Sequence, residues 1–174
     1  YSFKCLASAN ALSHIAGNRH QSNWAAMGIE EPWALGDLAL LEPQPLLPKP
    51  TEGENIIADY SSLGFSMGRH PLSLIRQQLA RRRMMPAELL RDMPDELPVR
   101  IAGLVIHRQR PESAKGTTFI TLEDETGHAN IIVWKTLGER QRRPLLRAHL
   151  MAVTGKVQRD GDVVQVLADR KSVV

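Results

Sequence analysis

Histidines and acidic residues are the side chains of this chain that could bind a metal or move protons. The six histidines are scattered along the sequence, and none has the spacing to another His or to Cys that a metal site requires. Glu123 and Asp124 are adjacent, so on a strand their carboxylates point to opposite faces and do not readily share one ion. Asp124 is better interpreted as a turn residue that binds its own backbone. We therefore expect no catalytic centre, metal site or cofactor in this chain.

Basic residues are concentrated in the second half of the chain. Residues 1–96 contain 9 Lys or Arg against 11 Asp or Glu, whereas residues 97–174 contain 13 against 8. The second segment therefore has a formal charge of +5, which favours a polyanionic partner such as nucleic acid. Aromatic residues make up only 5% of the chain, so a surface that stacks on nucleobases has few rings to use.

Composition also limits the cellular setting. The single cysteine, Cys5, excludes an internal disulfide framework and favours a reducing compartment. No apolar run has the length of a membrane span, and no signal peptide is visible at Tyr1. We expect a fragment of a longer cytoplasmic protein that does not contact a membrane.

The hydrophobic pattern becomes strand-like after Pro94. Three strands, a helix and two further strands follow in about 70 residues, which is the order of a five-stranded OB barrel. Asp160-Gly161 predicts the last hairpin, and Gly103 and Gly155 fit the bends that close a barrel. The predicted strands cover residues 99–107, 117–122, 129–134, 150–159 and 163–168. The segment 136–147 is predicted to be mostly helical, and Pro144 is expected to start a new turn or a break in it.

The first half of the chain is predicted to be helical, with a proline-rich interruption. Thr51 and Glu54 have the spacing of a capping box, Gly64 ends that helix, and Pro71 suits the first turn of the next one. The predicted fold is α+β, with N-terminal helical segments before the barrel. The expected boundaries are 1–28 for the first helices, 29–50 for a linker, 51–95 for a helical connector and 96–174 for the OB-fold domain.

An OB barrel binds oligonucleotides across strands two and three, between the loops that join strands one–two and four–five. Cations in these loops would pair with phosphates, and Gly116 would let the backbone approach closely. Trp134 and Phe119 could stack on bases, but we expect Phe119 to lie in the barrel core. For Arg140, Arg142 and Arg143 a solvated face and a binding role remain equally open. The predicted nucleic-acid contacts are Arg108, Arg110, Lys115, Gly116, Trp134, Lys156 and Arg159.

The most distinctive segment is Arg108-Gln109-Arg110-Pro111 followed by Ala114-Lys115-Gly116. It precedes the runs 119–127 and 130–134, and further characteristic segments are 17–21, 58–60, 63–72, 140–143 and 155–161. Together these segments resemble the C-terminal region of bacterial C-family DNA polymerases, the DNA polymerase III alpha subunits. The similarity is greatest to their error-prone, damage-induced (ImuC-type) branch.

This resemblance implies that the full-length protein is a DNA-directed DNA polymerase, a nucleotidyltransferase of DNA replication and repair. Such an enzyme performs translesion synthesis with Mg²⁺. Its catalytic carboxylates would lie outside this chain, which should therefore be inactive and hold no cofactor. Residues 1–28 would be the tail of a helix-hairpin-helix domain. The implied partners are single-stranded template DNA and two accessory mutagenesis proteins of the same operon, an inactive Y-family-like polymerase and a recombinase-like protein.

The segment Asp37-Leu38-Ala39-Leu40-Leu41 resembles the short peptides that bind the sliding clamp, although it lacks their first Gln and their aromatic end. Leu38, Leu40 and Leu41 are thus candidate contacts to a clamp or another partner.

The sequence is also compatible with two other functions. The region could be a protein-interaction module that docks the accessory proteins, which the low aromatic content favours. A tRNA anticodon-binding barrel of a synthetase fits the strand pattern, but the helical segment over 51–95 and the Arg108–Pro111 string argue against it.

Overall fold

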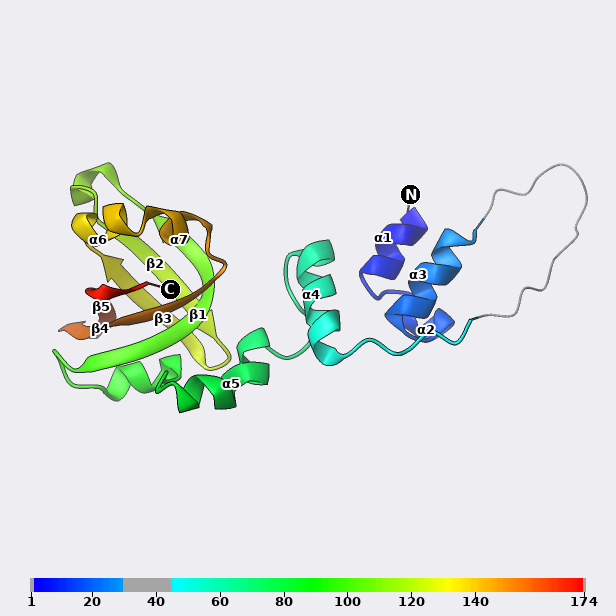
Figure 1. Ribbon diagram of the computed structural model, residues 1–174, viewed down its shortest axis with the longest axis horizontal. Coiled ribbons are helices and arrows are strands. Elements are labelled where there is room, and N and C mark those ends of the chain that lie inside the picture. The colour runs from blue at the N-terminus through cyan, green and yellow to red at the C-terminus, as the bar shows by residue number, and fades with distance from the viewer. Residues whose placement is uncertain (1, 30–44, 174) are drawn as a thin grey trace, which may run out of the picture. The chain divides into compact units, whose positions relative to one another are not determined.

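The computed structural model describes residues 2–29 and 45–173 (Figure 1). The chain divides into two units, Tyr1–Arg69 and His70–Val174. This division falls inside the segment 51–95, which the sequence predicts as a connector. Its first helix belongs to the N-terminal unit and its second helix to the C-terminal unit.

The described residues of the N-terminal unit form four helices: α1 (Ser2–Ser8), α2 (Ser13–Ala16), α3 (Arg19–Met27) and α4 (Glu52–Leu63). An ion pair between Arg19 and Asp59 joins α3 to α4, and Arg19 Nη1 also donates to the carbonyl of Asn55 at 2.8 Å. Both charged side chains are almost fully buried. Because a buried charge is stable only with a partner, this pair holds the two helices together.

The capping box predicted at the start of α4 is confirmed. The backbone N–H of Glu54 donates to Thr51 Oγ1 at 3.3 Å, and the Glu54 carboxylate accepts from the Thr51 N–H at 2.7 Å. The helix ends at Gly64, whose φ of +81° is a left-handed conformation that favours glycine.

Five strands of the C-terminal unit form a closed barrel in the order β1-β2-β3-β5-β4. The strand β3 pairs with β5 in parallel, and every other pairing is antiparallel. The predicted five-stranded OB barrel is therefore confirmed. The strands are β1 (Pro98–Gln109), β2 (Thr118–Asp124), β3 (Gly127–Val133), β4 (Leu150–Asp160) and β5 (Val163–Val173).

The segment between β3 and β4 is helical, as predicted, but it contains two short helices, α6 (Lys135–Arg140) and α7 (Arg142–Arg147). Pro144 explains the interruption, since it has no N–H to continue a helix from the preceding turn. It is tolerated in the first turn of α7, where no such bond is needed.

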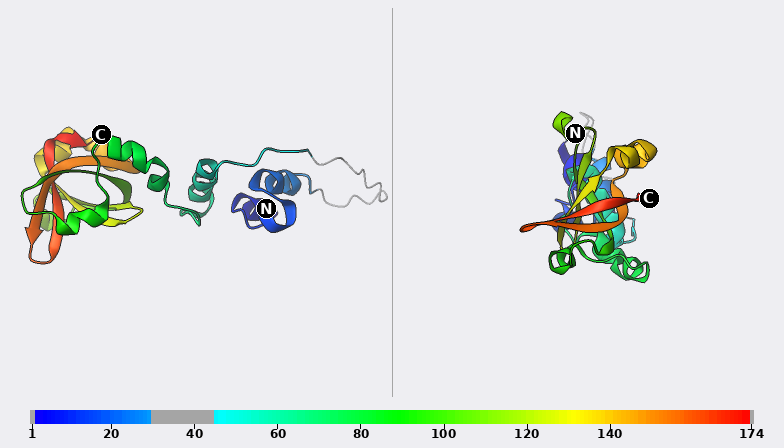
Figure 2. Two further views of the ribbon diagram at one scale, coloured as in Figure 1. Left: turned by 90° about the horizontal axis from the view of Figure 1, so that it is seen from below. Right: turned by 90° about the vertical axis from the view of Figure 1, so that its left-hand side faces the viewer.

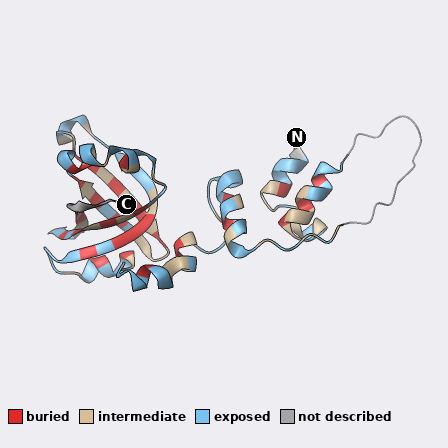
Figure 3. Ribbon diagram, in the orientation of Figure 1, coloured by how far each residue is buried: buried red, intermediate tan, exposed pale blue. Residues whose placement is uncertain are grey.

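Buried and more exposed residues alternate along the barrel strands, and the buried ones form the core. In β2, Ile120 and Leu122 are buried, whereas the alternate residues Phe119 and Thr121 are only partly buried. Figure 3 shows this pattern of buried and exposed positions on the barrel strands. The most fully buried side chains of the barrel are Ile101, Ile120, Leu122, Ile131, Val133, Met151, Val153, Val157 and Val166.

Two strand glycines lie where neighbouring backbone comes very close. A Cβ at Gly155 would lie 2.2 Å from the Leu167 carbonyl oxygen, and one at Gly103 would lie 2.8 Å from the Glu123 oxygen. The pairing register also shifts between Val153 and Gly155. Glycine at these positions thus permits the close strand crossing of a small barrel.

A segment before the barrel packs along its outer surface (Figures 1 and 2). The helix α5 (Pro71–Arg81) begins with Pro71 in its first turn, as predicted. Its Leu72 and Leu79 form a small cluster with Ala102 of β1. A 3₁₀ helix, η1 (Ala87–Asp92), follows, and Ala87 and Leu90 extend the barrel core.

Candidate nucleic-acid interface

An aromatic surface lies on the outer side of β2 and β3. Phe119 of β2 is directly paired with Ile132 of β3, and both lie on the side of the sheet opposite to the core residues Ile120 and Ile131. The expectation that Phe119 belongs to the barrel core is therefore wrong. The parity of β2 decides this, because Ile120 and Leu122 already occupy the inward positions.

Trp134 completes this surface at the end of β3. Trp134 is 53% exposed and occupies the N-cap position of α6, where its side chain forms no capping hydrogen bond. Together with Phe119 and Ile132 it lines a shallow pocket of about 450 Å³, which we call the stacking pocket. Lys115 and Lys135 lie at the same pocket and add positive charge. The remaining lining residues are Ser113, Ala114, Thr117 and Gln158.

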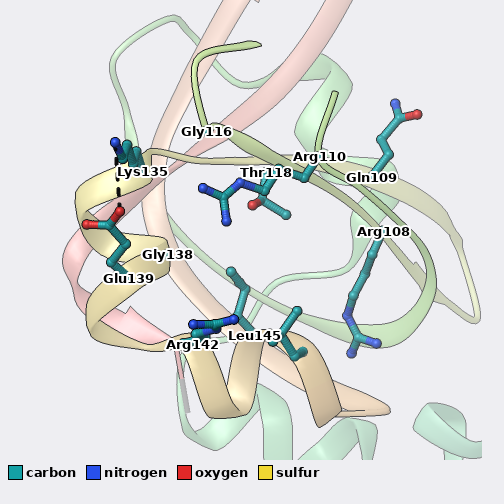
Figure 4. A pocket seen from close by; sticks show the side chains of 11 residues that line it. Arg108, Gln109, Arg110, Gly116, Thr118, Lys135, Gly138, Glu139, Arg142 and Leu145 are labelled. Carbon is teal, nitrogen blue, oxygen red and sulfur yellow. Dashed lines mark ion pairs between the residues drawn. The ribbon is translucent and has the colours of Figure 1, made fainter. Parts of the chain in front are cut away.

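The cations at the end of β1 and in the β1–β2 loop line two different pockets. Lys115, with a positive φ of 48°, lies at the stacking pocket, whereas Arg108, Arg110 and Gly116 line a second pocket on α6 and α7. We call this second cavity the loop–helix pocket (Figure 4). The predicted single basic loop surface is thus divided between two pockets, and Lys135 contributes to both.

Lys156 and Arg159 of β4 contact the segment before β1. Lys156 Nζ binds the Glu96 carboxylate at 2.8 Å, and this hydrogen bond raises the pKa of Lys156. The Arg159 guanidinium donates to the Met93 carbonyl at 3.0 Å, and its backbone N–H donates to Asp95 at 3.0 Å. Neither residue lines the stacking pocket or the loop–helix pocket.

Asp124 is confirmed as a turn residue. Its carboxylate accepts from the backbone N–H groups of Thr126 and Gly127 at 2.8 and 3.1 Å. It also accepts from Arg76 of α5 at 2.9 Å and from the Ala87 N–H at 2.8 Å. Burial by itself raises the pKa of Asp124. The hydrogen bonds from Thr126, the hydrogen bond from Ala87 and the charge of Arg76 lower it more, so the pKa lies below its usual value.

Ile132, Lys135 and Gln158 were not predicted as site residues. Their sequence signals are weak, since each is an ordinary residue of an amphipathic strand or a short helix. Ile132 could have been found from strand parity, because it pairs with Phe119. Lys135 directly follows Trp134, which is the only local signal that it offers.

Within residues 2–29 and 45–173, no group of three or more His, Cys, Asp or Glu is placed to hold a metal ion. No helix in this part of the chain has both the length and the apolar character to cross a membrane. The candidate clamp contacts Leu38, Leu40 and Leu41 lie outside the described residues.

Residues 99–174 match the family model described as an OB-fold nucleic acid binding domain. The chain is 49% identical over 168 residues to an error-prone DNA polymerase of Methylococcus capsulatus. This chain is homologous to a segment of error-prone DNA polymerases. An error-prone DNA polymerase of Alkalilimnicola ehrlichii is 50% identical over 166 residues. These alignments cover 96% and 95% of this chain, but only 16% of the length of each error-prone DNA polymerase.

Among solved structures, part of this chain is similar to asparaginyl-tRNA synthetase from Pyrococcus horikoshii. The TM-score is 0.44 at 19% identity, and the match covers 52% of this chain and 21% of that chain.

Proposed function

We propose that the barrel binds single-stranded DNA on the outer face of β2 and β3, as part of a DNA polymerase that copies damaged templates. The observation that carries this proposal is the stacking pocket, where Phe119 and Trp134 lie with Lys115 and Lys135. Aromatic rings stack on bases irrespective of sequence, while cations pair with the phosphates between them. This combination suits a template strand, whose sequence varies.

The proposal separates template binding from catalysis. In the whole protein the nucleotidyl transfer and its Mg²⁺ would belong to residues outside this chain, which would be inactive alone. A primer-extension assay with the purified chain tests whether it is inactive alone, and we expect no extension product. Extension of the primer would show that the chain has polymerase activity of its own.

Binding is best tested by fluorescence anisotropy with a labelled oligothymidylate at about 50 and 200 mM salt. We expect the affinity to fall as salt rises, and Trp134→Ala to weaken binding by about 10-fold because one stacking contact is lost. Trp134→Phe retains a ring and should bind nearly as well as the wild type. Ile106→Ala, which changes an exposed apolar residue of β1 outside the pocket, is the matched control. Equal binding by wild type and Trp134→Ala would overturn the proposal.

A second candidate function is docking of protein partners, and exposed apolar side chains of the N-terminal unit favour it. Ile15 is 86% exposed and Trp24 is 57% exposed, and exposed aromatic side chains such as that of Trp24 are enriched where proteins contact each other. The candidate partners are the sliding clamp and the two accessory mutagenesis proteins. Pull-down with each purified partner, using Trp24→Ala as the variant, tests this function. Undiminished capture by Trp24→Ala would exclude this surface.

A further inference from the structure

The loop–helix pocket is a cavity of about 430 Å³ between the β1–β2 loop and the helices α6 and α7. Arg108 and Arg110 enter it from the end of β1, and Lys135 and Arg142 enter it from the two helices. In Figure 4, Arg110 and Arg142 lie on opposite sides of the pocket with Leu145 between them, while Gln109 points away. A cavity of this size is within the range that small ligands occupy.

Positive charge in this pocket is poorly compensated. Within the described part of the chain, neither Arg110 nor Arg142 forms an ion pair. The carboxylate that lines the pocket is Glu139, which lies 3.9 Å from Lys135, and both of these side chains are more than half exposed. An ion pair as exposed as this one is weak, so it neutralises little of the positive charge in the pocket. Four cations and one carboxylate thus leave the pocket with a surplus of positive charge.

Arg108 adds an unpaired donor. Its guanidinium donates to the Ala148 carbonyl, which fixes the side chain against the end of α7. Its Nε, however, is buried and has no hydrogen-bond partner among the described residues. Among the described residues Arg108 is therefore held by a carbonyl and not by a carboxylate, so its positive charge is not neutralised by an ion pair.

Gly116 makes the convergence of two cations possible. A Cβ at this residue would lie 3.0 Å from Arg110 Nη2 and 3.0 Å from Lys135 Cδ. Its φ of +91° also favours glycine. The absence of a side chain at this point of the loop therefore leaves room for Arg110 and Lys135 to lie on the same side of the barrel.

We propose that the loop–helix pocket binds a phosphate group, or two linked phosphates, at a site separate from the stacking pocket. Arginine forks match the oxygens of a phosphate, and several of them together suit a multiply charged anion better than a single carboxylate. The Thr118 hydroxyl, which also lines the pocket, is a further donor. The proposal does not depend on base stacking by Trp134.

Two sources could supply this phosphate. One is a phosphodiester of a bound strand, since Lys135 lines both pockets. The other is a free phosphorylated molecule such as pyrophosphate or a nucleoside triphosphate. Both present the same oxygens to Arg110 and Arg142, so the experiment must separate them.

Calorimetric titration of the 174-residue chain with pyrophosphate, and anisotropy with an oligothymidylate, form the two arms. The test variant is the double substitution Arg110→Gln with Arg142→Gln. The matched control is Arg143→Gln, an exposed arginine of the same helix α7 that does not line the pocket. Circular dichroism checks that each variant is folded.

We expect the double variant to lose at least about 10-fold in pyrophosphate affinity, because it loses two charged donors, while Arg143→Gln remains unchanged. A parallel loss of oligonucleotide affinity, with competition by pyrophosphate, assigns the site to strand phosphates. Unchanged oligonucleotide binding assigns it to a free phosphorylated molecule. The proposal is overturned if the double variant changes neither affinity, or if the wild type prefers an oligoglutamate peptide to pyrophosphate. Trp134→Ala should leave the affinity for pyrophosphate unchanged. A failure of the proposed DNA binding at the stacking pocket can therefore be distinguished from a failure of the phosphate site.

Discussion

The guanidinium of Arg76 binds the carboxylate of Asp124 at 2.9 Å and thereby joins α5 to the end of β2. Asp124 is nearly fully buried and receives three backbone N–H groups besides this charge. Arg76 also binds Glu125 at 2.7 Å. The β2–β3 turn, the start of η1 and the helix α5 thus meet at one carboxylate.

Asp124→Ala should destabilise the C-terminal unit by about 3 kcal/mol, because it leaves Arg76 and several buried N–H groups without their acceptor. Urea unfolding at neutral pH, followed by circular dichroism, measures this loss. Glu123→Ala is the control, since its carboxylate makes no ion pair within the described residues. A similar stability of the two variants would show that the Asp124 contacts contribute little.

The same cluster should make stability depend on pH. Hydrogen bonds from Arg76 hold the pKa of Glu125 below its ordinary value of 4.5, and the pKa of Asp124 lies below 3.8. Because folding lowers both pKa values, the two carboxylates stabilise the folded state fully above about pH 4.5. This stabilisation is lost as the pH falls through the lowered pKa values. Urea unfolding of wild type and Arg76→Gln between neutral pH and about pH 3 checks this. We expect a shallower pH dependence for the variant, and parallel curves would contradict the assignment.

Gly155→Ala should disrupt the barrel, since its methyl group would lie 2.2 Å from the Leu167 carbonyl oxygen. We expect a loss of at least about 2 kcal/mol, because backbone cannot move aside as a flexible side chain can. Thermal unfolding measures it. Gly161→Asn is the matched control, as this hairpin glycine has open space around it and Asn tolerates its φ of +58°. Equal melting temperatures for the two variants would show that the barrel tolerates a side chain at Gly155.

Lys156→Gln should affect DNA binding less than Lys115→Gln, although both remove one positive charge. Lys156 is held by Glu96, whereas Lys115 lies at the stacking pocket. Anisotropy with an oligothymidylate at two salt concentrations compares the variants. We expect Lys115→Gln to reduce the salt slope by about 0.7, the value for one phosphate contact on a single strand. A larger effect of Lys156→Gln would place the strand on β4 instead.

Thr51→Ala should loosen the start of α4 by about 1 kcal/mol, because it removes the acceptor of the Glu54 N–H. Faster hydrogen exchange of the first α4 amides is the expected signature. Ser61→Ala is the control, since among the described residues that hydroxyl donates only to the Ala58 carbonyl of the same helix. Equal exchange rates of these amides in Thr51→Ala and Ser61→Ala would show that the cap does not stabilise the start of α4.

Local patterns in the sequence determined the elements of this protein. The capping box of Thr51 and Glu54, the turn at Asp124 and the alternating strands depend on neighbouring residues, so their spacing is sufficient to predict them. The order of strands and helix then determined the barrel, and the charge distribution identified the C-terminal unit as its basic part.

Only the tertiary structure decided which side chains meet. Strand parity in the closed barrel placed Phe119 outside and brought it to Ile132 and Trp134. The β1–β2 loop placed Lys115 at one pocket and Arg110 at the other, although they are five positions apart. Arg142, from a helix that follows β3, lines the same pocket as Arg110. These contacts depend on the path of the backbone between distant segments, which residue types and spacing along the chain do not encode locally.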